Sequence, residues 1–375
     1  MGTWKRVYHL AKNNEIFFYC IGNSHEIENA GELVSICQDT RVYERSTGIM
    51  TILKSIFLPY PAVSRWNKDL KKDLAIYCDK YQPDIIMIDY PQMYGCIPEQ
   101  LLKKYTIILN QHNIEHLALK SIAQNTNQKW KQLLYKVVEK QMFFYEKRLY
   151  HKGEIALYTF VSSEDKLYFE NMYNKNNTLL VPAGAEVRSY KKIVNEKNIA
   201  FVAQFSYLPN EMAAMWFLDR CWETVKKEMQ DVVLYLVGKK PTDRLKKRCE
   251  GDKQIVLTGT VDSLEPYYNS CNLVIVPVKN GGGVKIKLLE ALGYGKVVVT
   301  TKESICGTEF QHQQHILVAN SEDEFADFCI KILKNPKDYE TIRRNGYEKI
   351  LTTYSWEHIM ANFESEIKGL MKNPK

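Results

Sequence analysis

Several features that mark other classes of protein are missing from this chain of 375 residues. No apolar run approaches the roughly 18 residues that span a bilayer, and no charged segment followed by an apolar one opens the chain as a secretory leader would. The nine cysteines are scattered without a C-x-x-C pair, which argues against a disulfide framework or a zinc site. Neither a zinc-finger spacing nor an Arg-rich stripe supports binding of nucleic acid. These absences lead us to expect a protein of the reducing cytoplasm that has no nucleic-acid partner.

What is present is the composition of an ordinary globular protein, with 45% hydrophobic and 25% charged residues. The length exceeds the range over which a single core keeps growing, so two domains are expected. The net charge of +7 comes from 51 basic and 44 acidic residues. It suits phosphorylated small molecules or an anionic membrane surface as partners.

Apolar segments of β type alternate with helical patterns along most of the chain, which is typical of parallel sheets with helices on both faces. We therefore predict two Rossmann-like, doubly wound α/β domains of six strands each. The N-terminal one covers residues 1–182 and the C-terminal one residues 198–353. Residues 183–197 are polar and poor in strand formers, and they are predicted as the linker. A last amphipathic helix in residues 354–375 is predicted to pack back on the first domain.

The most informative segment of the chain is a break between an apolar strand and a helical pattern at three glycines, Gly281, Gly282 and Gly283. Glycine lets the backbone approach a ligand closely, and the unpaired N–H groups at a helix N-terminus favour an anion. Lys285 and Lys287 add cations in the first turn, where cations are unfavourable without an anion, and Glu290 lies on the helix face of Lys287. The pattern indicates a nucleotide diphosphate, with phosphates on the loop and lysines and a ribose on Glu290. The alternative is a surface loop followed by a helical ion pair between Lys287 and Glu290.

Polar residues also follow two expected strands of the first domain. His112 lies just beyond the strand near Thr106 to Leu109, and Asp89 and Gln92 follow the strand near Ile85 to Ile88. Ligands of open α/β sheets bind outside the carboxyl ends of the strands, and two such domains leave a cleft there. We therefore expect His112, Asp89 and Gln92 to face a ligand. The alternative for each is a structural capping role.

One segment of the first domain has two interpretations. Residues 49–58 are largely apolar with Lys54 as their only charge, and Arg65, Lys68, Lys71 and Lys72 follow closely. A basic, amphipathic surface of this kind can lie on anionic lipid and admit a lipid-linked acceptor. Under this interpretation the cytoplasmic protein also makes peripheral contact with the inner face of the plasma membrane. The alternative is a buried helix with a solvated basic neighbour.

The order of several short motifs resembles the GT-B glycosyltransferases of family 4, in the bacterial branch that builds exopolysaccharide and capsule sugars. The triglycine segment is specific in its context, and the other motifs are weak singly but together extend the resemblance from about residue 16 onward. The matching motifs begin at Gln82-Pro83-Asp84, His112-Asn113-Ile114-Glu115, Tyr145-Glu146-Lys147-Arg148, Pro209-Asn210, Val237-Gly238, Gly281, Gly307-Thr308-Glu309 and Tyr354-Ser355-Trp356-Glu357.

The resemblance implies a GT-B fold, in which two Rossmann-like domains face a cleft. It implies a retaining, metal-independent transferase that moves a sugar from a UDP-, GDP- or ADP-sugar to a glycan or lipid-linked acceptor during surface polysaccharide synthesis. The nucleotide-sugar is the substrate, so no cofactor and no metal site are expected.

The resemblance also assigns roles to residues. Lys285, Lys287 and the three glycines would stabilise the leaving diphosphate, and Glu290 would hold the donor ribose. His112 would lie beside the donor sugar, and His112, Lys287 and Glu290 are the expected catalytic group. The other expected donor-binding residues are Asn210, Gly238 and Thr308. Asp89 and Gln92 are expected on the acceptor side. Glu146 lies in a long helical pattern, where a solvated helix face is an equal alternative.

The chain departs from the family pattern at three places. Lys285 stands where an arginine is commoner, and Gly282 stands where many members carry a second glutamate. A GT-B first domain normally begins with a central strand, whereas Met1-Gly2-Thr3-Trp4-Lys5 already belongs to the following loop or helix, so the chain is expected to be truncated at its N-terminus and to lack the first strand. A start codon placed too late is favoured over a genuinely shortened protein, because loss of a central strand would expose the backbone groups of its neighbours. This departure keeps an inactive, nucleotide-binding homologue or scaffold as an alternative. A nucleotide-sugar epimerase on the same two-domain plan is the other.

Overall fold

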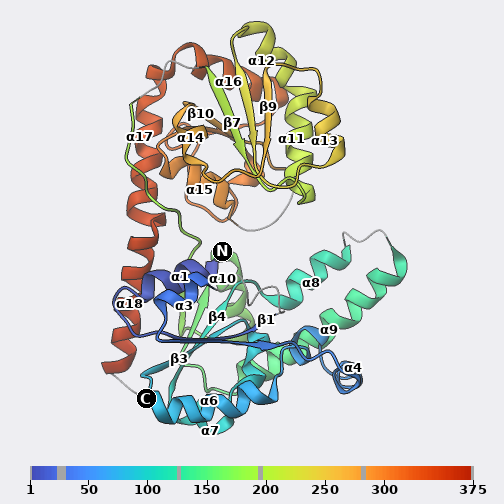
Figure 1. The fold of residues 1–375 in the computed structure, drawn as a ribbon, viewed down its shortest axis with the longest axis vertical. Helices are drawn as coiled ribbons and strands as arrows, with labels where there is room; N and C mark the ends of the chain where they lie inside the picture. The colour runs from blue at the N-terminus through green and yellow to red at the C-terminus, as the bar shows by residue number, and fades with distance from the viewer. Residues whose placement is uncertain (1, 23–30, 125–127, 193–196, 280–283, 373–375) are drawn as a thin grey trace. The chain divides into compact units, whose positions relative to one another are not determined.

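The structure is a computed structural model that describes residues 2–22, 31–124, 128–192, 197–279 and 284–372. It divides into two compact units, which are described separately below (Figure 1). The first unit contains residues 1–182 and 360–375, and the second contains residues 183–359. Within the described ranges, no helix combines the length and the apolar character that crossing a bilayer requires.

The first unit contains two parallel sheets and the helices around them. One sheet has two strands in the order β1-β2, and the other has four in the order β3-β4-β5-β6. In chain order the elements are α1 (Gly2–Leu10), β1 (Phe17–Gly22), α3 (Gly31–Ile36), β2 (Asp39–Glu44), α4 (Ile49–Lys54), α5 (Tyr60–Val63), α6 (Lys68–Tyr81), β3 (Ile85–Asp89), the 3-10 helix η1 (Pro91–Cys96), α7 (Glu99–Lys104), β4 (Thr106–Gln111), α8 (Glu115–Gln124), α9 (Lys129–His151), β5 (Leu157–Phe160), α10 (Ser163–Tyr173) and β6 (Thr178–Leu180).

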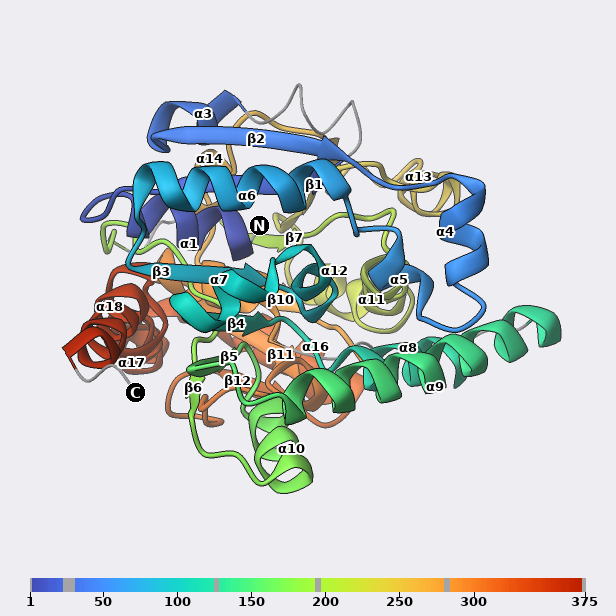
Figure 2. The ribbon, with the colours of Figure 1, turned by 90° about the horizontal axis from the view of Figure 1, so that it is seen from below.

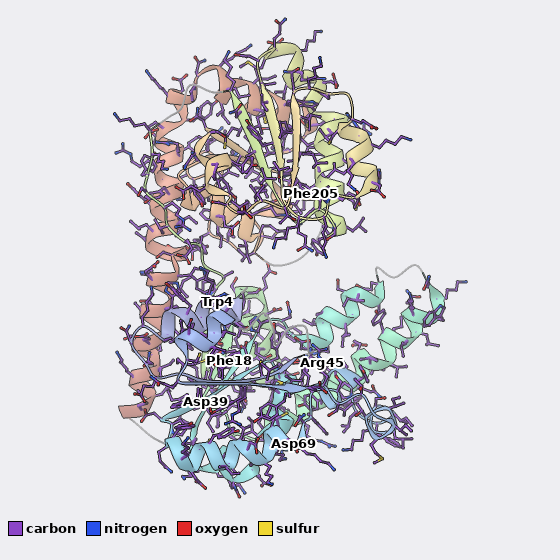
Figure 3. The ribbon with its side chains drawn as sticks, in the orientation of Figure 1. Trp4, Phe18, Asp39, Arg45, Asp69 and Phe205 are labelled. Carbon is purple, nitrogen blue, oxygen red and sulfur yellow. The ribbon has the colours of Figure 1, made fainter. Side chains whose placement is uncertain are left out.

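Burial in the first unit is greatest in the middle of the four-stranded sheet. Every residue of β5 is buried and so is β4 after its first residue, whereas β1 and β3 are mostly half-buried. Aromatic residues tie α6 to β1, because Tyr19 stacks on Tyr77 with ring centroids 4.7 Å apart, and Phe17 stacks on Tyr81 at 4.2 Å. The paired strands β1 and β2 carry the labelled Phe18 and Asp39 (Figure 3).

Two long helices form an antiparallel pair on the first unit. Helices α8 and α9 pack along each other, and both views show them as a hairpin that projects from the sheets (Figures 1 and 2). The short helix α4 lies on the same side of this unit in both views.

The second unit is built around one parallel sheet of six strands in the order β12-β11-β10-β7-β8-β9. Its elements are β7 (Asn198–Val202), α11 (Leu208–Arg220), α12 (Trp222–Glu228), β8 (Val233–Val237), α13 (Asp243–Cys249), β9 (Ile255–Gly259), α14 (Glu265–Asn269), β10 (Leu273–Val276), α15 (Ile286–Gly293), β11 (Val297–Thr301), the 3-10 helix η2 (Lys302–Ser304), β12 (Leu317–Ala319), α16 (Glu322–Lys334), the 3-10 helix η3 (Pro336–Tyr339), α17 (Glu340–Lys349) and the π-helix η4 (Ile350–Tyr354).

The core of the second unit encloses its central strands completely. All residues of β7, β10, β11 and β12 are buried, and Phe205, just beyond β7, is fully buried as well (Figure 3). Apolar runs without alternation are expected for parallel strands that helices cover on both faces. The predictions of an α/β chain with parallel sheets and of six strands in each half are confirmed over the described residues.

The segment that follows the first unit packs against the second. Ala185 donates its N–H to the carbonyl oxygen of Tyr354 at 2.8 Å, and Arg188 donates its N–H to that of Gly293 at 3.0 Å. The predicted linker, residues 183–197, thus belongs to the second unit in its described part. The last helix, α18 (Trp356–Lys372), begins in the second unit and ends in the first, where Asn13 donates to Glu364 at 3.2 Å.

The alternative that residues 49–58 form a buried helix is wrong. Helix α4 covers Ile49–Lys54, and Thr51 is its only buried residue. Ile49 is 77% exposed and Phe57 is 83% exposed. No described element covers this helix face, so its apolar side chains lie in water.

Candidate functional site

The strand order of the second unit creates one topological switch point. The chain passes from β7 to β8 and β9 on one side, whereas β10, β11 and β12 lie on the other. The connections that leave β7 and β10 therefore run to opposite sides of the sheet. Such a switch point leaves a crevice outside the carboxyl ends of the two strands, where ligands of open α/β sheets bind. Helix α11 follows β7 and helix α15 follows β10, so the first turns of both helices belong to this edge of the sheet.

Two predicted donor-binding residues meet at the switch point. Asn210 lies in the first turn of α11, and Lys287 lies in the first turn of α15. The Lys287 ammonium donates a hydrogen bond to Oδ1 of Asn210. Asn210 is buried and donates through Nδ2 to the carbonyl oxygen of Gln204 at 2.9 Å. The amide therefore has a fixed orientation, and its oxygen holds the lysine at the beginning of α15.

The two lysines of this turn are held partly out of water. Lys285 is the N-cap of α15, and its carbonyl oxygen accepts the N–H of Leu288 at 2.8 Å. Burial lowers the pKa of Lys285. Burial, and next the nearby charge of Lys285, lower the pKa of Lys287 to about 8, against the opposing effect of Glu290. Two neighbouring ammonium groups that lose hydration at a helix N-terminus form an electrostatic environment suited to an anion.

Glu290 occupies the same helix, one turn after Lys287. It is half-buried, and it lies close enough to Tyr268 for its charge to add to the burial that raises the pKa of this phenol well above the usual value. The Tyr268 ring stacks on Tyr294 with centroids 4.2 Å apart. The carboxylate thus lies near the stacked rings of Tyr268 and Tyr294, whose pKa values its charge helps to raise.

Backbone conformation explains Gly238, the predicted donor-binding residue after β8. Its φ is +145°, and a Cβ at this position would lie 1.8 Å from the carbonyl oxygen of Ala203. Only glycine can occupy this position, because any side chain would collide with the backbone that follows β7.

Thr308 lies in a turn next to the start of α15. Its hydroxyl donates to the carbonyl oxygen of Ile305 at 2.6 Å, within its own turn. A Cβ at the preceding Gly307, whose φ is +77°, would contact Val284 at 3.5 Å. The turn thus lies beside the residues that lead into Lys285, and Thr308 stabilises its shape.

The loop after β10 is anchored by hydroxyl groups that the sequence did not single out. Thr301 and Ser304 donate to the carbonyl oxygen of Val278 at 2.5 and 3.0 Å, and Ser304 also donates to that of Val276 at 3.0 Å. These bonds fix the backbone that runs into the glycine segment. The predicted phosphate-binding residues Gly281, Gly282 and Gly283 lie outside the described residues.

The first unit brings two of its predicted site residues together at the carboxyl ends of β3 and β4. Nε2 of His112 lies 3.1 Å from Oδ1 of Asp89, and Oδ2 of Asp89 accepts a hydrogen bond from the Thr3 hydroxyl at 2.5 Å. The Tyr90 ring stacks on the imidazole, with centroids 4.2 Å apart and planes 18° apart. Tyr90 has a φ of +71°, a strained conformation for a bulky residue that is common at functional sites.

The charge of Asp89 is stabilised by its neighbours. Burial alone would raise the pKa of Asp89, but hydrogen bonding and charge from His112, the Thr3 hydroxyl and the Arg6 guanidinium together lower it. Arg6 is buried, and it donates to the carbonyl oxygen of Val181 at 3.0 Å. The carboxylate therefore stays ionised and orients the imidazole of His112.

The third predicted residue of the first unit, Gln92, is buried in η1 and supports Glu115 rather than the pair of Asp89 and His112. Burial, and then the charge of Glu146, raise the pKa of Glu115, whereas a hydrogen bond from Gln92 and the charge of Arg65 act in the opposite direction. Glu115 is a residue that the sequence analysis named only as part of a motif.

Glu146 is fully buried, which excludes the solvated helix face that was an equal alternative for it. It accepts the backbone N–H groups of Glu115 and His116 at 3.1 and 3.2 Å, Nδ1 of His116 at 2.6 Å and the Tyr150 hydroxyl at 3.0 Å. The carboxylate of α9 thus caps the N-terminus of α8, which begins three residues after His112.

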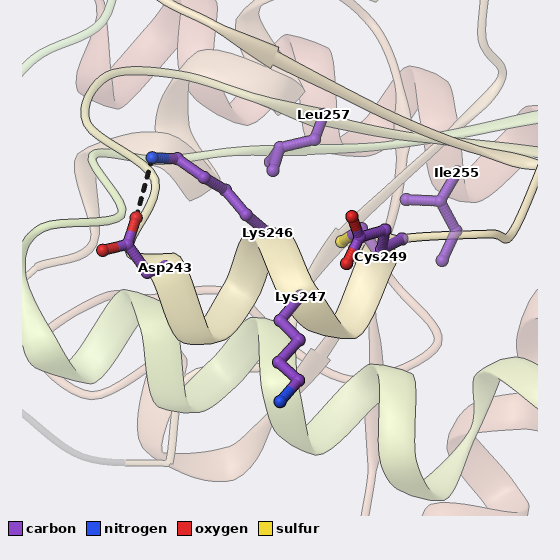
Figure 4. Close-up of a pocket in the computed structure, with 7 residues that line it drawn as sticks. Asp243, Lys246, Lys247, Cys249, Ile255 and Leu257 are labelled. Carbon is purple, nitrogen blue, oxygen red and sulfur yellow. Dashed lines mark hydrogen bonds and ion pairs between the residues drawn. The ribbon is translucent and has the colours of Figure 1, made fainter.

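An open hollow on the second unit, lined by α13 and β9, lacks the partly buried cations of the α15 turn (Figure 4). Lys246 in this hollow is exposed and pairs with Asp243 at 2.9 Å. Burial raises the pKa of Cys249 to about 11, so its thiol stays protonated near neutral pH. The hollow therefore offers neither desolvated cations nor a reactive thiolate.

Comparison with known proteins relates most of the second unit to one protein family. Residues 196–335 match the family model described as Glycosyl transferases group 1. A Klebsiella pneumoniae protein described as an uncharacterized 44.6 kDa protein in the cps region is 26% identical over 363 residues, which cover 91% of this chain and 88% of that protein.

Solved structures share the fold over most of the chain. A glycosyltransferase from Rickettsia africae superposes with a TM-score of 0.67 and 13% identity, covering 100% of this chain and 96% of that one. Anabaena Alr3699/HepE in complex with UDP and glucose superposes with a TM-score of 0.64 and 12% identity, covering 98% of this chain and 96% of that one. TarM superposes with a TM-score of 0.57 and 15% identity, and the match spans 77% of this chain but only 56% of TarM.

These similarities confirm the predicted fold class, a mixed α/β chain with parallel sheets of the GT-B glycosyltransferase type. The match of residues 196–335 to the group 1 glycosyl transferase model, together with the shared fold, supports a glycosyltransferase.

Proposed function

We propose that this chain is a retaining, metal-independent glycosyltransferase of family 4 that moves a sugar from a nucleotide-sugar to a glycan or lipid-linked hydroxyl in surface polysaccharide synthesis. The observation that carries the proposal is the pair Lys285 and Lys287, partly desolvated at the start of α15 and beside the switch point of a parallel sheet. A nucleoside diphosphate supplies the anion that this position favours.

The proposed chemistry requires stabilisation of the leaving diphosphate. Negative charge develops on the phosphate oxygen as the bond to the sugar breaks, and preorganised cations and N–H groups lower the free energy of that transition state. Lys287 is restrained by Asn210 before the substrate arrives, so little reorganisation is needed. In this proposal the lysines supply the positive charge that other transferases take from a metal ion. Glu290 accepts the ribose hydroxyls.

A UDP-sugar is the favoured donor among the three candidates. The Anabaena structures were solved in complex with UDP, with UDP and glucose and with UDP-glucose, and their chains share the fold of this protein. The relative from the cps region of Klebsiella pneumoniae supports a role in capsule-type polysaccharide. We also propose that the enzyme acts in the cytoplasm, with peripheral contact to the inner face of the plasma membrane.

His112 is proposed to hydrogen-bond the hydroxyl groups of the sugar. Its Nε2 lies against Asp89 and its ring is clamped by Tyr90, so the imidazole has one orientation. A histidine that is held in this way can position a substrate hydroxyl or take its proton. Asp89 orients His112, and Gln92 orients Glu115 next to it.

The experiment that tests the proposal is a thermal-shift titration with UDP-, GDP- and ADP-glucose, followed by calorimetry with the best ligand. Stabilisation grows with the excess of ligand over its dissociation constant. We expect a saturable shift with UDP-glucose that Lys287→Ala and Glu290→Ala remove and that Lys334→Ala, a surface change, leaves unchanged. An unchanged shift in both site variants would place the donor elsewhere.

Product analysis separates transfer from the two alternatives. Transfer releases UDP in proportion to glycosylated acceptor, an epimerase converts the donor sugar without any acceptor, and an inactive homologue binds the donor without releasing UDP. Incubation of the full chain with labelled UDP-glucose and a membrane extract as the acceptor source distinguishes these three outcomes.

A further inference from the structure

A row of apolar side chains on α9 faces water. Trp130 is 64% exposed, and Leu133 and Phe144 are each 65% exposed. Leu134 and Val137 are exposed as well. Relative to Trp130 these residues stand at i+3, i+4, i+7 and i+14, so they share one face of the helix.

The same helix already buries another face. Met142, Glu146, Leu149 and Tyr150 are its buried residues, and α8 packs along it. The exposed row is therefore a second apolar face, one that the packing of the first unit does not need.

Residues 49–57 extend this face. Ile49, Met50, Ile52 and Leu53 are exposed on α4, and Ile56 and Phe57 follow them. Within α4, Thr51 alone is buried, so nearly the whole circumference of this short helix is open.

A side chain of α9 joins the two elements. Gln141 donates through Nε2 to the carbonyl oxygens of Ser55 and Ile56, at 3.1 and 2.9 Å. Gln141 lies between Val137 and Phe144 on the exposed row, so the segment that follows α4 is hydrogen-bonded near the Phe144 end of that row. We call the exposed apolar residues of 49–57 and of α9 together the α4–α9 surface. Figures 1 and 2 show the two elements on the same side of the first unit.

Basic residues border the α4–α9 surface. Lys129, Lys136, Lys140 and Lys147 are exposed and recur at intervals of seven, four and seven residues, which places them on one stripe next to the apolar row. Helix α9 carries five lysines and one arginine against two glutamates, one of them the buried Glu146. The border is therefore positive.

This combination of chemistry distinguishes a lipid partner from a protein partner. Large exposed apolar patches mark interaction sites, but protein interfaces are depleted in lysine. A bilayer interface instead favours an apolar face with a tryptophan and a lysine border, because the apolar residues enter the acyl boundary while the ammonium groups meet lipid phosphates. Anionic lipid attracts each such lysine.

We infer that the α4–α9 surface binds an anionic phospholipid bilayer, with the apolar residues of α4 and α9 inserted and the lysine stripe on the headgroups. This inference deepens the membrane contact in the proposed function, and its test measures lipid binding without any sugar transfer. Failure of one is therefore distinguishable from failure of the other.

The test is flotation of the full chain with vesicles of phosphatidylcholine alone and of phosphatidylcholine mixed with phosphatidylglycerol. We expect recovery with the anionic vesicles and little with the neutral ones, and loss of recovery at high salt, because salt screens the lysine contribution. Leu133→Ser combined with Leu134→Ser should weaken binding about tenfold or more, since each leucine loses the benefit of leaving water. Lys136→Glu combined with Lys140→Glu should also weaken it about tenfold or more.

Matched variants control for general effects of apolarity and charge. Leu167, which is 59% exposed, and Met172 lie on α10 outside the surface, so Leu167→Ser with Met172→Ser should float like the wild type. Lys227→Glu with Lys247→Glu makes the same charge change on exposed positions of the second unit and should also float normally. All variants should keep the wild-type melting temperature in the absence of lipid and nucleotide, which shows that they are folded.

A second measurement uses Trp130 itself. The difference between emission spectra of the wild type and Trp130→Phe isolates this residue among the six tryptophans, and it should shift to shorter wavelength with anionic vesicles. Equal flotation of the surface variants and their controls, or an unshifted Trp130, would overturn the inference. Concentration-dependent self-association that Leu133→Ser abolishes, without lipid binding, would assign the surface to a second copy of the chain and equally overturn it.

Discussion

The charged groups at the predicted sites of the two units have different neighbours. In the first unit the buried or half-buried acids have partners within the fold, Asp89 with His112 and Glu146 with His116. In the second unit Lys285 and Lys287 lose hydration next to each other, and a neutral amide restrains Lys287. Buried charges are normally paired. The first unit thus orients its acids through its own network, whereas Lys287 of the second unit lies beside a second cation and a neutral amide.

The apolar surface differs in the same sense. The sheet of the second unit is covered so fully that its central strands are buried along their whole length. The first unit leaves an apolar row on α9 and nearly all of α4 in water. The second unit therefore buries its apolar strands, whereas the first unit leaves a large hydrophobic surface exposed.

The largest effect is expected from removing the central acceptor of the first unit. Glu146→Leu would leave two backbone N–H groups, the His116 imidazole and the Tyr150 hydroxyl without their common acceptor. The expected loss in free energy of unfolding is about 3–5 kcal/mol. Hydrogen exchange of the α8 and α9 peptides should become much faster, while peptides of the second unit stay protected.

Glu139→Leu on the same helix is the control for this change. Glu139 is half-buried and should cost less than about 1 kcal/mol. If both variants exchange at the wild-type rate in α8, the network does not hold this helix.

The second-largest effect is expected from removing the charge of Lys287, whose burial destabilises the folded protein. Lys287→Met should weaken UDP binding about 100-fold, since a charge-assisted contact contributes up to about 3 kcal/mol. The same change should stabilise the ligand-free protein, because the pKa of Lys287 falls from 10.5 to about 8 on folding. Loss of the hydrogen bond to the Asn210 amide lowers the free energy of unfolding by about 1–2 kcal/mol and offsets part of this gain. The expected net rise in Tm is about 2–6 °C.

Calorimetry with UDP and a melting curve without ligand measure the two halves of this prediction. Lys334→Met, which removes a surface partner of Glu228, should change neither by more than the error. A Tm that falls for Lys287→Met would show that this lysine stabilises the fold.

A smaller effect is expected from pH. Because the pKa of Lys287 is lowered to about 8 by burial, the side chain is charged at pH 7 and largely neutral at pH 9. The affinity for UDP should fall about tenfold across this range. The unfolded chain binds the proton more strongly than the folded chain between about pH 8 and 10.5, so the stability of the ligand-free protein should rise with pH over the same window. Titrations at both pH values with Lys287→Met, which should bind weakly and without this dependence, identify the group.

The smallest effect concerns a helix end in the first unit. Gln82 terminates α6 with a φ of +45°, in the left-handed region. Gln82→Gly should stabilise the protein by about 0.5 kcal/mol, because glycine adopts this conformation without the Cβ penalty. Asn174→Gly, at the corresponding position after α10, should change the free energy of unfolding less, because asparagine tolerates this region. Urea unfolding of both variants measures the difference.

Several site residues could be placed from sequence because their neighbours along the chain define them. His112 and Asp89 follow two strands that are consecutive in the chain, and consecutive parallel strands usually pair, so their side chains meet at one edge. Lys285, Lys287 and Glu290 share one short helix, whose period relates them. Asn210 was found through a motif, but its bond to Lys287 depends on the adjacency of β7 and β10.

Other features could not be placed because local patterns have more than one solution. A glutamate beside Lys147 and Arg148 has the pattern of a solvated helix face, and only the packing of α8 against α9 buries Glu146. The row from Trp130 to Phe144 has the spacing of a core helix face, yet it lies in water. For the same reason, the sequence could not decide whether residues 49–58 are buried or exposed.

The order of strands and lysines along the chain determined the α/β class and the position of the lysine-bearing first turn of α15, because strand and helix periodicities and N-terminal charge are local properties. The burial of Glu146, the restraint of Lys287 by Asn210 and the exposure of the α4–α9 surface were decided by tertiary structure alone. Burial depends on which distant segments cover a side chain, and no local period records that choice.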